Sequence, residues 1–344
     1  MAEVVPILAA HFDRALVLDE LDKAQSLLTH WSGHQGAQRS PSFRLAQARL
    51  HRAFGRKSDS KRVAQELLAE GLQPQDRGFW GACFLAGLES GVGEFADVLE
   101  LPFWLEVERH RWHTLSPKPD LLIERAEAMA DDTMIAYSWF VACESWLRLE
   151  QDGRFQEAWD HAATLLRALP APRLLPRLEL LAMIGHLRLD RDAEAWSHGQ
   201  QAQANLMPDQ TQLGERVSLW TSLLHLRAGR RSDAADTLRV FQPGRQKSLL
   251  LGQWASHAAI AYAAGEKTES REHLVRFSVA DEQLAVGSLS ALEFLLWLGD
   301  SAEAQGDEAI CEAALRCALR VAGRSGLART VAELDDRLGE SPSL

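Results

Sequence analysis

The chain has 344 residues, of which 46% are apolar and 25% are charged, a balance that excludes an intrinsically disordered chain and is typical of a soluble folded protein. Its 37 Lys and Arg residues against 48 Asp and Glu residues give a net charge of −11, so the average field repels a phosphate backbone and disfavours nucleic acid as a partner. The four cysteines form no C-x-x-C pair, so neither a disulfide framework nor a zinc cluster is expected.

The N-terminus does not predict export, and no segment predicts a membrane span. Glu3 precedes a short apolar run that His11 and Asp13 interrupt, whereas a secretory signal needs a basic start and a longer apolar run. No apolar segment approaches the length that crosses a bilayer. Only six of the basic residues are Lys, a bias typical of GC-rich bacterial genomes. We therefore expect a cytoplasmic bacterial protein.

The first 131 residues predict helix pairs that repeat loosely. Alternating runs of Val, Ile, Thr and Tyr, which mark strands, are nearly absent from the whole chain. Asp19 and Gly55 indicate turns 36 residues apart. Ser40 followed by Pro41 predicts the start of a helix, with a capping side chain and Pro in the first turn.

From residue 132 onward the helix pairs are clearer. In SWFVACESWLRL, the residues Trp139, Ala142, Trp146 and Leu149 fall at steps of three and four, on one face of a helix. Turn signals then interrupt the apolar helices at intervals of 37, 39, 36 and 41 residues, and such a period is typical of helix-pair arrays. The turns centre on Gly153, Asp190, Gly229, Gly265 and Gly306.

Each turn predicts how one helix ends and the next begins. A glycine tolerates the left-handed conformation that closes the first helix. A Ser, Thr or Asp then caps the second helix, and the suitable residues are Ser232, Thr268 and Asp307.

The C-terminal segment predicts a helix that closes the array. Leu327, Val331, Leu334 and Leu338 fall on one side at helical spacing. Because the last pair of an array must cover its apolar face, we expect a capping helix from about residue 326 to 339. Its other sides carry Arg329, Glu333, Asp336 and Glu340.

These units resemble tetratricopeptide repeats. Gly153 is followed by Phe155, Ala158 and Pro170 at the family's offsets, and Leu298-Gly299 precedes Gly306 at the expected distance. Trp254 stands before Gly265 where the family has a bulky residue. Departures from the family's pattern are Trp146 at a small-residue position, Ser270 and Cys311 in place of the small Ala, and Asp190 in place of a turn glycine.

The resemblance, taken with the spacing of the turns, implies one all-α domain. We expect an α-solenoid, a right-handed superhelix of about nine antiparallel helix pairs plus a C-terminal capping helix. It would span residues 1–340 as a single array, with a loose tail at 341–344. Within it we expect degenerate repeats over 1–131, clearer repeats over 132–323 and the capping helix over 324–340. The family implies an inner surface that holds peptides or protein segments, and it implies no activity.

Three short patterns suggest chemistry that their context does not support. Gly299-Asp300-Ser301 resembles an esterase nucleophile block, but this Ser is predicted to lie within a helix rather than on a strand-to-helix turn. Glu106, His110 and His113 share a helical face, which is more typical of a solvated face than of a metal site. The stretch 91–96 follows a helix and has no Lys, so a phosphate cradle is not expected. We therefore expect no catalytic residue, no metal and no cofactor.

The eleven tryptophans are expected mostly in the core, where large rings fill gaps between stacked pairs. Trp146 in particular is predicted to lie between the two helices of its pair and to touch Ala158 or its neighbours. One or two of the others could line a groove, because buried interface anchors are often Trp.

A partner-binding groove is predicted on the first helices of the pairs, beside the face that packs. It would be apolar with acidic edges, suited to a helical or extended peptide that bears Arg or Lys. The alternative is that its apolar members are simply core residues. The predicted groove residues are Phe140, Cys143, Leu147, Glu150, Ala255, Ala259, Tyr262, Glu293, Leu296 and Asp300, with Glu303 continuing the last line.

The sequence thus favours a non-enzymatic interaction scaffold, an adaptor or a chaperone, which could belong to a larger complex. A first alternative is a module that senses a ligand or peptide within a transcriptional or signalling system, although no P-loop or basic recognition helix is visible. A second alternative is a helical enzyme with acidic residues facing a cavity, which no metal-ligand spacing supports.

Overall fold

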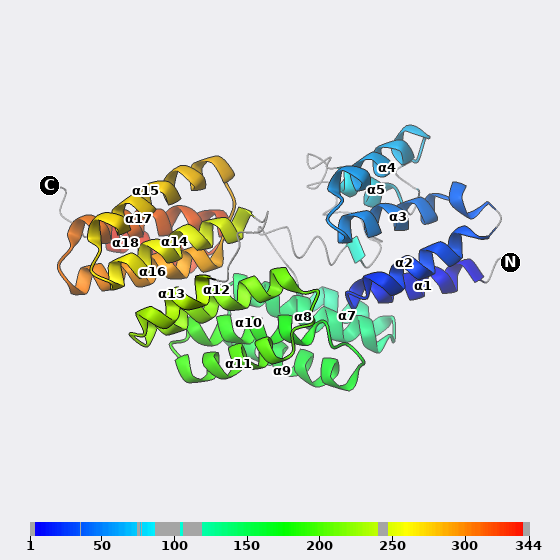
Figure 1. Ribbon diagram of the computed structural model, residues 1–344. Coiled ribbons are helices and arrows are strands. Elements are labelled where there is room, and N and C mark those ends of the chain that lie inside the picture. Colours follow the sequence, from blue (N-terminus) through cyan, green and yellow to red (C-terminus); the bar gives the residue numbers. More distant parts are fainter. Residues whose placement is uncertain are drawn as a thin grey trace. The chain divides into compact units, whose positions relative to one another are not determined.

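The computed structural model describes residues 4–34, 36–73, 76, 78–86, 104–105, 119–239 and 247–339. Within these ranges the chain forms α-helices and one short 3₁₀ helix, with no strand. The helices follow one another as neighbouring pairs (Figure 1). The prediction of an all-α helical-repeat architecture is confirmed.

Contacts group the chain into two units. Unit 1 comprises residues 1–113, 117–141 and 165–174, and unit 2 comprises 114–116, 142–164 and 175–344. The expectation of a single continuous stack over 1–340 stays a prediction.

Unit 1 contains two successive helix pairs and parts of later helices. α1 (Val4–Val17) packs on α2 (Leu21–Ser32), and α3 (Pro41–Ala53) packs on α4 (Lys57–Ala69), which also contacts α5 (Phe79–Ala86). The 3₁₀ helix η1 (Ala37–Arg39) lies between α2 and α3, and α7 (Pro119–Ala128) and the first part of α8 (Asp132–Arg148) complete the described helices.

The predicted turn and cap signals of unit 1 are confirmed. Asp19 and Gly55 adopt left-handed conformations, with φ of 60° and 74°. The Ser40 hydroxyl accepts a hydrogen bond from the Phe43 N–H at 3.2 Å, with Pro41 in the first turn. Phe43 in turn meets Trp31 edge to face at 5.7 Å in the buried core.

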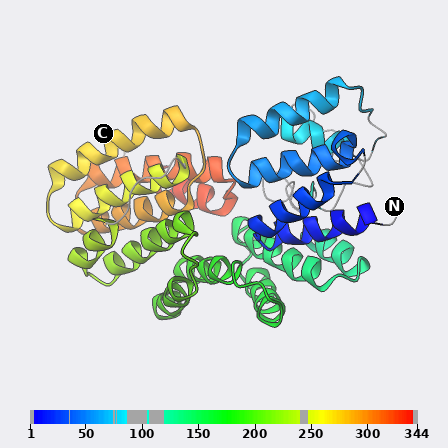
Figure 2. The same cartoon turned by 45° about the vertical axis from the view of Figure 1, so that its right-hand side comes forward.

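Unit 2 begins with the end of α8 and most of α9 (Asp152–Ala168) and continues as four pairs and a final helix (Figures 1 and 2). We call the first helix of each pair an A helix and the second a B helix. The A helices are α10 (Leu175–Arg188), α12 (Thr211–Arg227), α14 (Lys247–Ala263) and α16 (Leu289–Ala304). The B helices are α11 (Asp192–Ala204), α13 (Arg231–Arg239), α15 (Lys267–Leu284) and α17 (Glu308–Ser325), and the final helix is α18 (Ala328–Gly339).

The A helices of unit 2 form a layer that curves inward. Each contacts its own B helix, the first three also contact the next A helix, and α12 contacts α16, two pairs further on. A close approach of α9 and α10 depends on Gly185, because a Cβ placed there would lie 2.2 Å from the ring of Phe155.

The A-to-B turns of unit 2 fall where the spacing predicted, with one correction. The left-handed residues are Glu150, Asp190, Gly229, Gly265 and Gly306. The prediction that Gly153 forms the first of these turns is wrong, since Gly153 lies inside α9. Glu150 takes the left-handed conformation instead, with φ of 56°.

Of the three predicted B-helix caps, one is confirmed. The Asp307 carboxylate accepts a hydrogen bond from the Ile310 N–H at 3.3 Å at the start of α17. The predictions for Ser232 and Thr268 are wrong, because both lie inside the first turn of their helices, and the residue that precedes α15 is Glu266.

Tryptophans occupy the interior to different degrees. Trp31, Trp146 and Trp220 are buried, and the guanidinium of Arg154 lies 4.6 Å from the centre of the Trp146 ring. The other tryptophans among the described residues are half-buried, so their rings fill gaps between helices but keep one edge accessible. The contact of Trp146 with Ala158 stays a prediction.

Candidate partner-binding surface

The predicted groove residues of α16 lie on one accessible line of that helix. Leu296 is half-buried, Asp300 is exposed, and Glu293 is nearly buried, with 11% of its side chain exposed, at steps of three and four. Glu303 continues the same line and is exposed. Arg188 of α10 lies beside Glu293. We call the surface formed by Arg188 and by the α16 residues Glu293, Leu296, Asp300 and Glu303 the A-helix surface.

The predicted groove residues of α8 and α14 lie in the interior instead. Phe140, Cys143, Ala255 and Ala259 have 0% of their surface exposed, and Leu147 and Tyr262 have 4% and 3%. On α8 the accessible line is one position further along, at Glu144 and Arg148. In this structure the buried six contribute packing, and their contact with a partner stays a prediction.

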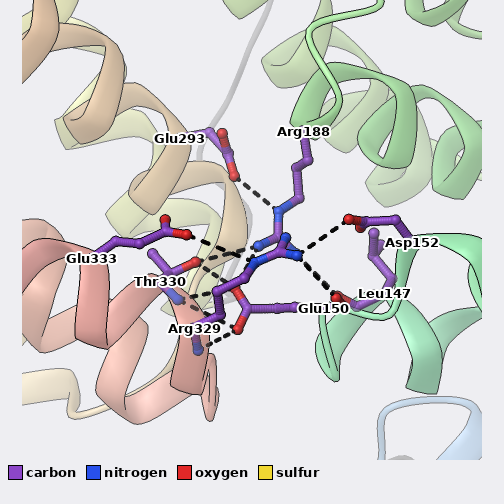
Figure 3. A network of polar contacts seen from close by, with 8 residues as sticks. All are labelled: Leu147, Glu150, Asp152, Arg188, Glu293, Arg329, Thr330 and Glu333. Atoms are coloured by element: carbon purple, nitrogen blue, oxygen red, sulfur yellow. Dashed lines mark hydrogen bonds and ion pairs between the residues drawn. The ribbon is translucent and has the colours of Figure 1, made fainter.

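Two of the predicted acidic residues, Glu150 and Glu293, are brought together by Arg188 (Figure 3). The Arg188 Nη2 lies 2.9 Å from Glu150 Oε1, and its Nε lies 3.5 Å from Glu293 Oε1. Its Nη1 donates to the Leu147 carbonyl at 3.0 Å. The side chains of Arg188 and Glu150 are only 8% and 3% exposed, so this is a nearly buried ion pair whose remaining polar atoms need partners.

Those partners come from the start of α18 (Figure 3). Glu150 Oε2 accepts the backbone N–H of Arg329 at 2.8 Å, and Oε1 accepts the N–H of Thr330 at 3.3 Å and its hydroxyl. Glu150 therefore caps a helix that begins 178 positions later in the chain. A carboxylate at this place also complements the positive end of the helix dipole.

The pKa values of the two carboxyl groups around Arg188 shift in opposite directions. Burial opposes ionisation of Glu150, but the hydrogen bonds from Thr330 and Arg329 and the charge of Arg188 outweigh it and lower its pKa. Burial raises the pKa of Glu293, and the charges of Arg188 and Arg227 only partly oppose this. Glu150 is the closer partner of Arg188, so it keeps the negative charge more readily than Glu293.

A similar contact joins the next pair. Arg227, at the end of α12, lies 2.6 Å from Asp190 in the turn of the preceding pair and 2.9 Å from Asp192, the first residue of α11. Thus the last residue of an A helix binds the acidic turn before it, as Arg188 does with Glu150.

Sequence reasoning missed the arginines Arg188 and Arg227, although a signal was present. His-Leu-Arg occurs at 186–188 and again at 225–227, in each case at the end of an A helix. Arg188 lies 38 positions after Glu150, and Arg227 lies 37 positions after Asp190. One repeat length therefore separates each arginine from the acidic turn residue that it binds.

The other end of α18 reaches the exposed part of the A-helix surface. Arg337 Nη2 lies 2.9 Å from Asp300 and 2.7 Å from Glu303. Arg329 also reaches the Asp152 carboxylate at 3.3 Å. Arg329 is exposed on the polar side of α18, as the sequence predicted, and it also binds the turn between α8 and α9.

Of the three patterns that suggested chemistry, the structure describes one. Ser301 lies within α16, as expected, and Gly299 before it packs against Leu315. Glu106, His110, His113 and the stretch 91–96 lie outside the described residues. None of the helices in the described ranges combines the length and the apolar composition that a membrane span requires.

Comparison with protein families and with curated proteins finds no match. Among solved structures, the chain is similar to a Rap protein complexed with competence and sporulation factor, with 12% identity and a TM-score of 0.55. That alignment covers 98% of this chain and 97% of the other. A second, the Cut9-Hcn1 hetero-tetramer of the APC/C, gives 12% identity and a TM-score of 0.48 over 93% of this chain and 60% of that one. The first likeness and the pairing of the helices show a tetratricopeptide-like helical-repeat fold.

Proposed function

We propose that this chain is a non-enzymatic interaction scaffold, which binds a peptide or protein segment on the A-helix surface of unit 2. The observation that carries the proposal is the line Glu293, Leu296 and Asp300 on α16, where an apolar side chain lies between acidic ones. Leu296 is half-buried and Asp300 is exposed, and Glu293 keeps 11% of its side chain accessible. Such a line suits a partner with an apolar residue flanked by Arg or Lys.

The similar Rap structure supports this class of function, because its description names a complex with competence and sporulation factor. By analogy, the partner here would be a peptide or protein segment rather than a reaction substrate. The inward curve of the A layer adds to this, because a curved layer of helices presents several of them to one extended partner.

The test is a binding assay with full-length chain as bait and lysate of the source organism, followed by identification of the bound protein. The surface variant carries Leu296→Ala and Asp300→Asn. The matched control is Asp236→Asn, an exposed acid on α13 that pairs with Arg239 in its own helix at 3.1 Å. We expect the surface variant to lose at least about tenfold in captured partner, equivalent to about 1.4 kcal/mol.

The control should capture as much partner as the parent chain. The proposal would be contradicted if the surface variant kept full binding with an unchanged melting temperature, or if both variants lost binding equally.

A further inference from the structure

α18 is attached to unit 2 by few apolar contacts. Within the helix only Thr330 and Leu334 are buried, and Leu327 is buried just before it. The remaining attachments are polar: the Glu150 cap, Arg329 with Asp152, and Arg337 with Asp300 and Glu303. The helix is thus an amphipathic segment that buries Leu327 and Leu334 and adds polar contacts through its arginines and its N-terminal N–H groups.

The acids that α18 contacts are largely those predicted to receive a partner's basic residues. Glu150, Asp300 and Glu303 were all placed on the predicted groove lines, and each now meets a group from α18. The two arginines are eight positions apart, about 12 Å along a helix. An acidic turn therefore meets one end of α18, and the acidic end of α16 meets the other.

We infer that α18 occupies the partner site as an internal ligand, and that the partner is itself an amphipathic helix with α18's pattern. That pattern is an arginine, an apolar residue five positions later and a second arginine three beyond it, as in Arg329, Leu334 and Arg337. The inference rests on the proposed function and names its partner class. Binding would require α18 to leave Asp300 and Glu303.

The exposure of these pairs permits such an exchange. The side chains of Asp300 and Glu303 are 62% and 65% exposed, and ion pairs in water hold weakly. α18 follows α17 directly, so its effective concentration at the site is high, on the order of millimolar for a short tether. A free helix must overcome that advantage, so weakening α18 in the chain should strengthen binding of the free helix.

The experiment measures binding of a fluorescent peptide of residues 326–339 to the full chain by anisotropy. The test variant carries Arg329→Ala and Arg337→Ala. The control is Arg316→Ala, an exposed arginine on α17 whose contact is Glu312 in the same helix. We expect the peptide to bind the test variant at least about tenfold more tightly than the parent or the control, and a peptide lacking both arginines to bind none of them.

Equal binding to parent and test variant, or no binding to either, would overturn the inference. In the first case the proposed function could still stand on the capture assay with Leu296→Ala and Asp300→Asn, so the two failures are distinguishable. If the test variant fails to fold, the parent chain provides the test. An excess of isotopically heavy peptide should displace α18 and so speed hydrogen exchange at amides 329–339 of the chain itself. Unchanged exchange with the peptide bound would contradict displacement.

Discussion

The carboxylate of Glu150 accepts the backbone N–H of Arg329 at 2.8 Å, joining the turn after α8 to the first turn of α18 across 179 positions of sequence. Arg188 lies on the other side of the same carboxylate at 2.9 Å. One acidic side chain thus holds two elements of unit 2 that are remote in sequence, and its removal affects both.

Replacing Glu150 with Ala should destabilise unit 2 by about 3–5 kcal/mol, because it leaves Arg188 nearly buried and the N–H groups of α18 without their acceptor. Chemical denaturation with a parallel measurement of hydrogen exchange in α18 checks this. The control is Glu157→Ala, at an exposed position of α9, which should change stability by less than about 0.5 kcal/mol. Equal stability of Glu150→Ala and the control would show that this network contributes little.

Two glycines in neighbouring helices should respond oppositely to alanine. Gly185→Ala places a methyl group against Phe155 and should cost about 1–3 kcal/mol. Gly153→Ala meets nothing within 4 Å in α9 and should stabilise the chain by about 0.5–1 kcal/mol. The melting temperatures of the two variants, each compared with that of the parent chain, measure both changes in stability. A loss of stability in Gly153→Ala would indicate that position 153 needs glycine, as in the left-handed turn that the spacing predicted there.

Much of the fold could be predicted from the sequence, because helical spacing and turn residues repeat within each pair. The first turn of the clear repeats was misplaced at Gly153, since glycine is the usual left-handed residue and Glu150 gives no local sign of that conformation. The α8 groove line was displaced by one position. The charged residues Glu144 and Arg148 mark the accessible line of that helix, and they were available in the sequence.

The polar network could not be predicted, because its members are distant in sequence. Arg188 meets Glu293 only when the A layer curves and returns α16 toward α10. Spacing within one pair carries no information about that curvature. Likewise the C-terminal helix was predicted from its own apolar face, while its contacts with Glu150 depend on the path of the whole unit.

Trp146→Ala should cost about 3–5 kcal/mol by leaving a cavity beside α9, since this ring is 6% exposed. Denaturant titration of the variant measures the loss. Trp139→Ala, a half-buried ring on the same helix, is the comparison and should cost less. A variant that unfolds at the denaturant concentration of the parent would place Trp146 against solvent or a partner.

His186 should make unit 2 sensitive to mild acid. Its ring stacks on His198 at 5.1 Å, and burial, with a smaller contribution from the charge of His198, lowers its pKa below the ordinary 6.5. Because the unfolded chain takes up the proton more readily, stability is complete above about pH 6.5 and falls as the pH drops below it.

Melting temperatures from pH 8 to pH 5 check this, with His186→Phe as the variant that cannot titrate and His161→Gln as an exposed control. The His186→Phe variant should lose less stability than the parent between pH 7 and 5, and the control should follow the parent. Burial also lowers the pKa of His225 and His257, so part of the acid sensitivity should remain. Identical pH profiles for parent and His186→Phe would contradict the assignment.

If the A-helix surface of unit 2 binds a protein segment, a photoreactive side chain on that surface should crosslink to the bound segment. A photoreactive amino acid replaces Leu296 on α16 in one chain and Val275, which is 64% exposed on the outer helix α15, in another. After irradiation in lysate, we predict a crosslinked partner from position 296 that Asp300→Arg reduces, and none from position 275. A partner that crosslinks from position 275 and not from position 296 would show that it does not bind the A-helix surface.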